Sequence, residues 1–419
     1  MGSHFLLDLL LVLSGAWALG YLAQWLGLPV MLGELAAGLL LGPTVLGLIK
    51  PSEALDLLAE LGIFLAMFYA GLEMDPRELV EHFRPSVAVA LGGFFLPFVL
   101  GAGVIYLLGG TVYQSLFVGM GTSITAIAVQ AVILQSLRIH RTQLGHIIIG
   151  AALVDDVLAL ITLSFLIGLV RRGQPDLAGM TLLALKVLLF FGLTILIGEF
   201  LVPRVAGRIT DEGGKALTFA LLVALIMAYL AERAGLHQVI GAFLAGQFVR
   251  REILRPEVYE NISRYFYGLS YGFLLPVFFV TLGFQLHWSM EPRFWLLAGL
   301  ITAVAVIGKF AGAGLGLRIF GFGFWECLVV GAGMNGRGAV ELIVAAVAMN
   351  LSQDLLSRGV ISAPLLTPSQ FSALVIMAFL TTFMAPIVLK WAALRACRGS
   401  ERAEFCRLLR EARREPAAG

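Results

Sequence analysis

The sequence predicts an all-α polytopic membrane protein with about 13 transmembrane helices, arranged as two inverted six-helix repeats with crossed discontinuous helices. Three observations predict this fold. Hydrophobic residues make up 59% of the 419 residues and charged residues only 13%, whereas a soluble domain carries about a quarter charged residues. Apolar segments long enough to cross a bilayer follow one another with short polar breaks. Patterns from the first half of the chain recur in the second half.

The apolar segments group into consecutive parts of the chain. Residues 1–4 resemble an expression-tag remnant and carry no weight in the fold. We expect the first repeat over residues 5–170, a linker helix over 179–202, the second repeat over 215–391 and a basic cytosolic tail over 392–419. The expected membrane segments are about 5–26, 29–49, 55–73, 86–108, 113–137, 142–170, 179–202, 215–232, 236–250, 262–285, 293–317, 323–349 and 366–391.

The positions of lysine and arginine predict the orientation of the chain. Loops on one side of the membrane carry more of these residues, including Arg138, Arg141, Arg250 and Arg251, than loops on the other side, which include Lys50. Cytoplasmic loops of membrane proteins are enriched in Lys and Arg. We therefore expect a multi-pass protein of the bacterial inner membrane with its N-terminus outside and its C-terminus in the cytoplasm.

Two pairs of segments carry the repeat. Residues 28–38 share their Gly and Ala pattern with residues 236–246, and residues 119–130 are similar in style to residues 331–342. An odd number of membrane segments separates the two copies, so they would cross the membrane in opposite directions. Inverted repeats are typical of secondary transporters, whose binding site lies at the repeat interface near the bilayer midplane. The alternative is that Gly- and Ala-rich helices resemble each other by composition alone.

The segments 113–137 and 323–349 contain residues that favour interrupted helices. Glycines accompany Ser123 and Thr125 in the first of them, and Asn335, Arg337 and Glu341 in the second. Interrupted helices expose carbonyl groups and helix ends at membrane depth, where they need partners or line a cavity. Small residues also promote ordinary helix packing, but the four-residue spacing of Arg337 and Glu341 would pair these charges on one helix face.

Isolated charges inside apolar segments give the strongest site prediction. Asp155 and Asp156 are adjacent within the apolar run Ile147–Val170, and Lys309 is the only charge between Phe294 and Leu317. Ionisable residues at bilayer depth are costly and usually functional. Neighbours on a helix point about 100° apart, so one aspartate is expected to bind an ion and the other a positive partner, for which Lys309 is the candidate. A static Asp–Lys pair that only stabilises the bundle is the alternative.

Several motifs together resemble a known transporter family. They include Gly150-Ala-Ala-Leu-Val-Asp-Asp-Val-Leu158, Gly308-Lys-Phe-Ala-Gly312 and Gly333-Met-Asn-Gly-Arg-Gly-Ala-Val-Glu-Leu342. From about residue 10 to residue 392, the chain resembles the second monovalent cation:proton antiporter family, and most closely the bacterial electrogenic sodium/proton antiporters. The stretch Ser123-Ile-Thr-Ala-Ile-Ala-Val-Gln130 is more similar to the Kef-type potassium efflux proteins, which leaves K⁺ open as an alternative to Na⁺.

The resemblance implies a core (transport) domain, a dimerisation domain and a homodimer. It also implies that Asp156 binds the cation and exchanges protons, and that Asp155 pairs with Lys309 when no cation is bound. Thr125 and its neighbours would line the crossing of the broken helices. Asp156 is then the expected Na⁺ ligand, with Thr125 as a further ligand.

The sequence therefore predicts a secondary-active antiporter that exchanges Na⁺ or Li⁺ for H⁺, electrogenically and by alternating access, in pH homeostasis. Its partners would be monovalent cations, protons, the lipid bilayer and a second copy of the chain; no enzymatic activity, cofactor or nucleic acid is expected. A K⁺/H⁺ antiporter of the Kef type that lacks its regulatory domain is the alternative. An intramembrane aspartyl protease is disfavoured, because its two carboxylates must share a proton, which adjacent residues of one helix cannot do.

Overall fold

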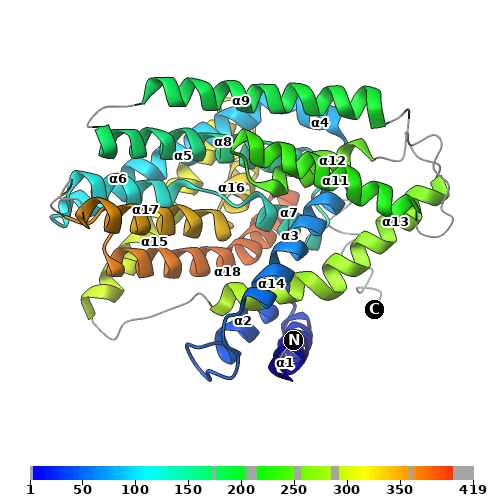
Figure 1. Ribbon diagram of the computed structural model, residues 1–419, viewed down its shortest axis with the longest axis horizontal. Coiled ribbons are helices and arrows are strands. Elements are labelled where there is room, and N and C mark those ends of the chain that lie inside the picture. Colours follow the sequence, from blue (N-terminus) through cyan, green and yellow to red (C-terminus); the bar gives the residue numbers. More distant parts are fainter. Residues whose placement is uncertain are drawn as a thin grey trace. The chain divides into compact units, whose positions relative to one another are not determined.

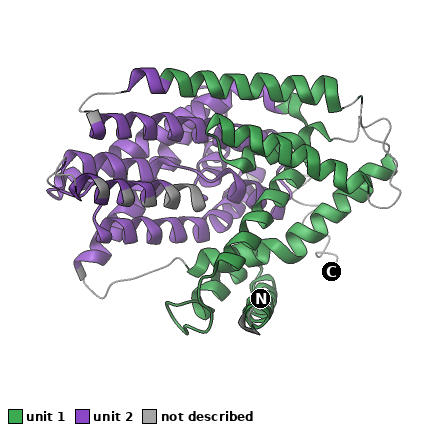
Figure 2. Ribbon diagram, viewed as in Figure 1, with its two compact units in different colours: residues 1–78, 181–284 green, residues 79–180, 285–419 purple. Residues whose placement is uncertain are grey.

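The computed structural model is helical and divides into two compact units (Figure 2). The structure describes residues 3–172, 176–202, 204, 215–249, 256–284, 292–357, 361 and 363–399. Within these residues, 10 helices are long and apolar enough to cross a membrane, and three shorter apolar helices accompany them. This is the all-α polytopic membrane protein that the sequence predicts, while the count of about 13 transmembrane helices remains a prediction.

Unit 1 consists of residues 1–78 and 181–284 and so combines segments from both halves of the chain (Figure 2). The chain changes unit within α4 (Pro76–Glu81), within α9 (Leu177–Leu196) and after Phe284. The other helices of unit 1, labelled in part in Figure 1, are α1 (Ser3–Trp25), α2 (Val30–Leu41), α3 (Glu53–Glu73), η1 (Ile197–Leu201), α11 (Lys215–Ala234), α12 (Gln238–Phe248), α13 (Pro256–Leu269), η3 (Ser270–Leu274) and α14 (Leu275–Phe284).

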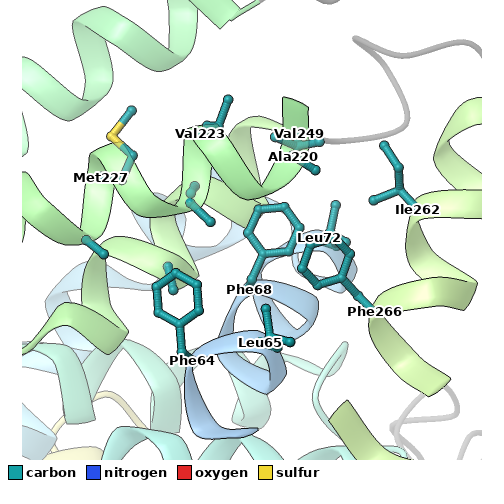
Figure 3. Close-up of a cluster of buried hydrophobic side chains, with 14 of the residues drawn as sticks. Phe64, Leu65, Phe68, Leu72, Ala220, Val223, Met227, Val249, Ile262 and Phe266 are labelled. Atoms are coloured by element: carbon teal, nitrogen blue, oxygen red, sulfur yellow. The ribbon is translucent and has the colours of Figure 1, made fainter. Parts of the chain in front are cut away.

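The core of unit 1 is a cluster of buried aromatic and aliphatic side chains between α3, α11, α12 and α13 (Figure 3). Phe64, Phe68 and Phe266 lie in this cluster with Met227. The rings of Phe68 and Phe266 are 4.4 Å apart between centroids, which is a favourable separation for an aromatic pair. Burial of these large side chains gives the unit its own apolar core.

Glycines in the repeated pattern allow the helices of unit 1 to approach closely. A Cβ atom at Gly33 would overlap the Leu19 carbonyl of the preceding helix α1, and a Cβ atom at Gly241 would overlap the Met227 carbonyl of the preceding helix α11. Gly246 lies in the same way against α3. Small residues permit such backbone contact between membrane helices. Glycine thus serves the same purpose in α2 and α12, while the inverted repeat remains a prediction.

Unit 2 consists of residues 79–180 and 285–419 (Figure 2). Its helices are α5 (Phe83–Leu107), α6 (Val112–Ser123), α7 (Ile127–Ser136), α8 (Gln143–Arg172), α15 (Pro292–Arg318), α16 (Phe324–Gly333), α17 (Ala339–Ser357) and α18 (Pro368–Gly399) (Figure 1). All residues that the sequence singles out as a site belong to this unit.

In unit 2, α5 packs closely against α15. Gly92 and Gly312 lie backbone to backbone at this crossing, and a Cβ atom on Gly308 would lie 2.6 Å from the Cα atom of Pro97. The absence of side chains at these positions therefore lets α5 lie directly against the turn of α15 that carries Lys309. Lys309 is fully buried there.

Four helix boundaries differ by six residues or more from the expected segments. α2 ends at Leu41, short of residue 49, where Gly42 and Pro43 follow, because proline cannot continue the helical hydrogen bonding. α13 begins at Pro256, earlier than residue 262, because the polar face of this amphipathic helix hides its start from a hydropathy pattern. At the other end of the chain, α17 extends to Ser357 and α18 to Gly399, beyond residues 349 and 391.

Candidate functional site

Asp155 and Asp156 lie in α8, and both are buried. Asp155 is 0% exposed and Asp156 is 5% exposed. The carboxylate oxygen Oδ2 of Asp155 lies 3.3 Å from Nζ of Lys309 on α15, and both side chains are fully buried. The structure thus joins the two isolated charges that the sequence predicts to be partners, across two helices of unit 2.

Thr125 connects this ion pair to the broken helices. Nζ of Lys309 donates a hydrogen bond of 2.5 Å to Oγ1 of Thr125, and this hydroxyl donates to the carbonyl oxygen of Met334 at 3.3 Å. A threonine hydroxyl has one donor and can also accept, and here it uses both functions. Asp155, Lys309, Thr125 and Met334 therefore form one continuous buried chain of polar contacts.

The first break comprises residues 124–126, between α6 and α7. The polypeptide is extended there, with φ −64° and ψ 142° at Ile124 and φ −91° and ψ 105° at Ala126. Because the helix stops, carbonyl groups at the end of α6 lack helical partners. The Arg337 guanidinium donates to three of them, with its Nη1 at 3.1 Å from Gly121 O and 2.6 Å from Ile124 O, and its Nη2 at 2.6 Å from Thr122 O.

This arrangement places a full positive charge on a helix C-terminus. The C-terminal end of a helix carries a partial negative charge, which a cation stabilises. Arg337 is 0% exposed, so no water screens the interaction. Charge-assisted hydrogen bonds are roughly twice as strong as neutral ones. Arg337 therefore acts as a built-in cation at the end of α6.

The second break comprises residues 334–338, between α16 and α17. Carbonyl groups of this break and of the preceding end of α16 accept hydrogen bonds from neutral donors. Nδ2 of Asn335 donates to Gly331 O at 2.7 Å, and Gly336 O accepts from Nε2 of Gln130 at 2.9 Å and from the backbone N–H of Ala126 at 3.2 Å. The last of these bonds joins the two breaks directly. Lys309 reaches this region through Thr125.

Several buried side-chain oxygens of this region accept no hydrogen bond from the part of the chain that the structure describes. They are Oδ1 of Asp155, Oδ1 of Asn335 and Oε1 of Gln130. In both amides the nitrogen is held by a carbonyl group, which fixes the oxygen on the opposite side of the amide. Carboxylate and carbonyl oxygens suit hard cations. Among the described residues there is no group of three or more His, Cys, Asp or Glu side chains that could hold a metal ion.

The sequence also matches a known family of membrane transporters. Residues 9–395 match the family model described as "Sodium/hydrogen exchanger, transmembrane". The chain belongs to the sodium/hydrogen exchanger family. This finding agrees with the resemblance to sodium/proton antiporters drawn from the motifs.

Relatives of this exchanger match over nearly their whole length. The Na⁺/H⁺-K⁺ antiporter GerN of Bacillus cereus is 33% identical over 394 residues, which cover 93% of this chain and 97% of GerN. A Na⁺/H⁺ antiporter of Enterococcus hirae is 31% identical over 396 residues, which cover 93% and 98% of the two chains. The fold is similar to that of the sodium proton antiporter MjNhaP1 of Methanocaldococcus jannaschii, with a TM-score of 0.73 at 19% identity over 96% of this chain and 100% of that one.

The structure brings most of the predicted site residues of this exchanger together. Asp155, Lys309 and Thr125 are in contact, Asp156 follows Asp155 in α8, and Asn335 lies in the second break. The hydroxyl of Ser123 instead donates to Gly119 O at 2.8 Å, within its own helix. The Ser123 side chain therefore contributes a hydrogen bond to α6 and none to the ion pair.

The contacts of Arg337 differ from the helical pair with Glu341 that the sequence predicts. Arg337 precedes the first residue of α17, and its guanidinium binds the carbonyls of α6. The four-residue spacing positions side chains on one face only when both residues are helical. Glu341 lies in α17, but its side chain is outside the described part of the structure.

Two residues of this site were not assigned from the sequence. Gln130 donates to Gly336 O, and Thr382 of α18 bonds to the backbone of Arg337. A buried amide within an apolar segment is a signal that could have singled out Gln130. Thr382 has no such signal, because threonines in membrane helices commonly bond to their own helix, as its neighbour Thr381 does.

Proposed function

We propose that this exchanger is a secondary-active antiporter that exchanges Na⁺ or Li⁺ for H⁺ across a bacterial inner membrane, with cation and proton competing for Asp156. The family and the names of the relatives above support sodium/proton exchange. The single observation that supports the role of Asp156 is the buried contact of 3.3 Å between its neighbour Asp155 and Lys309.

The contact distinguishes the two adjacent carboxylates. Asp155 already has a positive partner in Lys309, while Asp156 points about 100° away around the helix. A charge at the bilayer centre costs at least about 2.5–3.5 kcal/mol on insertion scales, so a buried carboxylate is favoured when a counter-charge or a proton neutralises it. We assign the exchange of a cation for a proton to Asp156, as the motif resemblance implies, because its neighbour Asp155 is paired with Lys309.

Oxygen atoms around the breaks would complete the cation site. Thr125 Oγ1 and the buried amide oxygen of Asn335 belong to the same region as Asp155. When Asp156 is ionised, it attracts a hard monovalent cation, and these oxygens replace part of the cation's water shell. When Asp156 is protonated, this attraction is lost and the cation leaves. Exchange follows because both ligands cannot occupy the carboxylate at once.

Lys309 would make the exchange electrogenic. A cation bound beside Asp155 weakens the hold of this carboxylate on Lys309, and a buried lysine without its counter-charge gives up its proton readily. One proton from Asp156 and one from Lys309 would then move for each monovalent cation. This stoichiometry transfers net charge in every cycle.

The remaining features of the transport cycle are part of the same proposal. Unit 2 carries all the named site residues, so its movement would expose the site alternately to the two sides of the membrane. We propose an N-terminus outside, a cytoplasmic C-terminus and a homodimer. Regulation of cytoplasmic pH is the expected physiological role.

Proteoliposomes that contain the purified protein and a pH-sensitive dye test the proposal. Addition of Na⁺ or Li⁺ is expected to collapse an imposed pH gradient, and Asp156→Asn is expected to abolish this response. Asp56→Asn, which neutralises a carboxylate in the first turn of α3, serves as the control and should transport normally. Persistent exchange of Na⁺ for H⁺ by Asp156→Asn would contradict the proposal. Addition of K⁺ in the same assay tests the Kef-type alternative, which the comparisons do not support.

A further inference from the structure

The hydroxyl of Thr382 forms two hydrogen bonds to the backbone of a single residue in the second break. The backbone N–H of Arg337 donates to Oγ1 of Thr382 at 2.9 Å, and this hydroxyl donates to the carbonyl oxygen of Arg337 at 2.8 Å. Thr382 lies in α18, which contains no other residue of the site described above, and is 1% exposed. Both groups belong to unit 2.

These two bonds replace the hydrogen bonds of a helix. In a continuous helix, a backbone N–H bonds to the carbonyl four residues before it, and the carbonyl bonds to the N–H four residues after it. At Arg337 a hydroxyl from another helix provides both partners. Buried backbone groups need such partners, because a buried group without one is destabilising. The Thr382 side chain therefore stabilises the interrupted conformation of this segment at the expense of the helical one.

Arg337, whose backbone is held in this way, in turn positions the rest of the site through its side chain. Its guanidinium binds the carbonyls of Gly121, Thr122 and Ile124 at the end of α6. Ile124 directly precedes Thr125, whose hydroxyl contacts Lys309. The contacts run without interruption from α18 through Arg337 and the first break to the Asp155–Lys309 pair.

We propose that Thr382 is a positioning residue of the cation site: its hydroxyl holds the second break, and through Arg337 the first break, in the geometry that binds the transported cation. This role rests on the function proposed for the Asp156 site. Thr382 touches neither the cation nor a transported proton.

The adjacent threonine provides a matched control. Thr381 is also fully buried in α18, but its hydroxyl donates to carbonyls of its own helix, Met377 O at 2.7 Å and Ala378 O at 3.1 Å. Thr→Val replaces the hydroxyl by a methyl group of similar size. Thr381→Val and Thr382→Val therefore remove the same group from neighbouring positions, and only the second loses contacts with the break. Thr382→Ser retains the hydroxyl.

The test compares the three variants with the unmodified chain in proteoliposomes, by the KM and maximal rate of Na⁺-driven proton movement. Thr382→Val should raise the KM for Na⁺ by about tenfold, since loss of one or two buried hydrogen bonds has an effect of this order. Thr381→Val should change the KM by less than about twofold, and Thr382→Ser should restore it. Equal effects of the two valine variants, or a failure of serine to restore the KM, would overturn the proposal.

Hydrogen–deuterium exchange of the same variants gives a readout that does not depend on transport. Thr382→Val should accelerate exchange in peptides that contain residues 335–338, while Thr381→Val should leave it unchanged. If the unmodified chain exchanges no cation for protons, the proposed function fails, and this measurement still decides the role of Thr382. Unchanged protection of residues 335–338 in Thr382→Val would overturn it.

Discussion

The two helix breaks of unit 2 solve the same physical problem in different ways. In both, a helix ends inside an apolar segment and leaves carbonyl groups that need positive partners. At the first break, residues 124–126, these partners come from the charged guanidinium of Arg337. At the second break, residues 334–338, and at the end of α16 before it, they come from neutral groups of Asn335, Gln130, Ala126, Thr125 and Thr382.

The difference separates a permanent charge from a variable one. A guanidinium always carries its proton, so the charge at the first break is the same throughout a transport cycle. Arg337 belongs to the second break, but its guanidinium binds carbonyls of the first. The carbonyls of the second break accept from neutral groups, and Lys309 reaches them through the Thr125 hydroxyl. A positive charge near the second break can therefore change as cations and protons bind and leave. We infer that the Arg337 guanidinium supports the fold at the first break, while ion exchange uses the contacts of Lys309, Thr125 and Met334 that join the two breaks.

The largest effect on the protein is expected when Arg337, the permanent charge at the first break, is replaced. Arg337→Met should lower the stability of the solubilised protein by about 4 kcal/mol or more, because hydrogen bonds to charged groups contribute about 1.5–3 kcal/mol each. The measurement is a thermal unfolding curve in detergent. Arg395→Met is the control, because Arg395 lies over the rings of Trp325 and Trp391 at the end of α18, a contact that contributes about 0.5–1 kcal/mol at exposed sites. Equal shifts of the midpoint in both variants would contradict the comparison.

A smaller effect is expected when the variable charge is removed. Lys309→Gln keeps a side chain that can bond to Thr125 but removes the positive charge beside Asp155. We expect this variant to fold and to exchange cations more slowly, by about tenfold, the effect of about 1.4 kcal/mol. Its exchange should no longer respond to membrane voltage, which a potassium diffusion potential across the proteoliposome tests. Lys309→Arg, which retains a charge, should keep the voltage response; its loss there would argue against a charge-based role.

The smallest effect is expected from a neutral contact of the second break. Gln130→Leu removes the hydrogen bond to Gly336 O and should raise the KM for Na⁺ by about threefold, since one neutral hydrogen bond contributes about 0.5–1.5 kcal/mol. Gln135→Leu, in the same helix, is the control, because no hydrogen bond of this amide to another described residue is found. A larger effect of Gln135→Leu than of Gln130→Leu would show that the contact at Gly336 is unimportant.

Much of the site could be predicted because its charges are isolated. Asp155, Asp156 and Lys309 interrupt long apolar runs, and burial makes such charges seek partners. The two breaks could be predicted because Gly, Ser, Thr and Asn are poor helix formers. For both kinds of feature, the physical cause lies in the local sequence.

The contacts of Arg337, Gln130 and Thr382 could not be predicted in the same way. Each of them joins segments that are far apart in the sequence, such as Gln130 with Gly336. The spacing of Arg337 and Glu341 suggested a helical pair, but the helix begins only at Ala339. A polar side chain in an apolar segment shows that a partner is needed, and only the tertiary structure shows which partner it has.

The central claim is that a cation and a proton occupy Asp156 in turn. The most direct test is the KM for Na⁺, measured in proteoliposomes over a series of pH values. Competition predicts that the KM rises as the pH falls, by up to about tenfold per pH unit for a single competing proton, while the maximal rate at saturating Na⁺ stays nearly constant. A KM that is independent of pH, with a maximal rate that falls instead, would contradict the account.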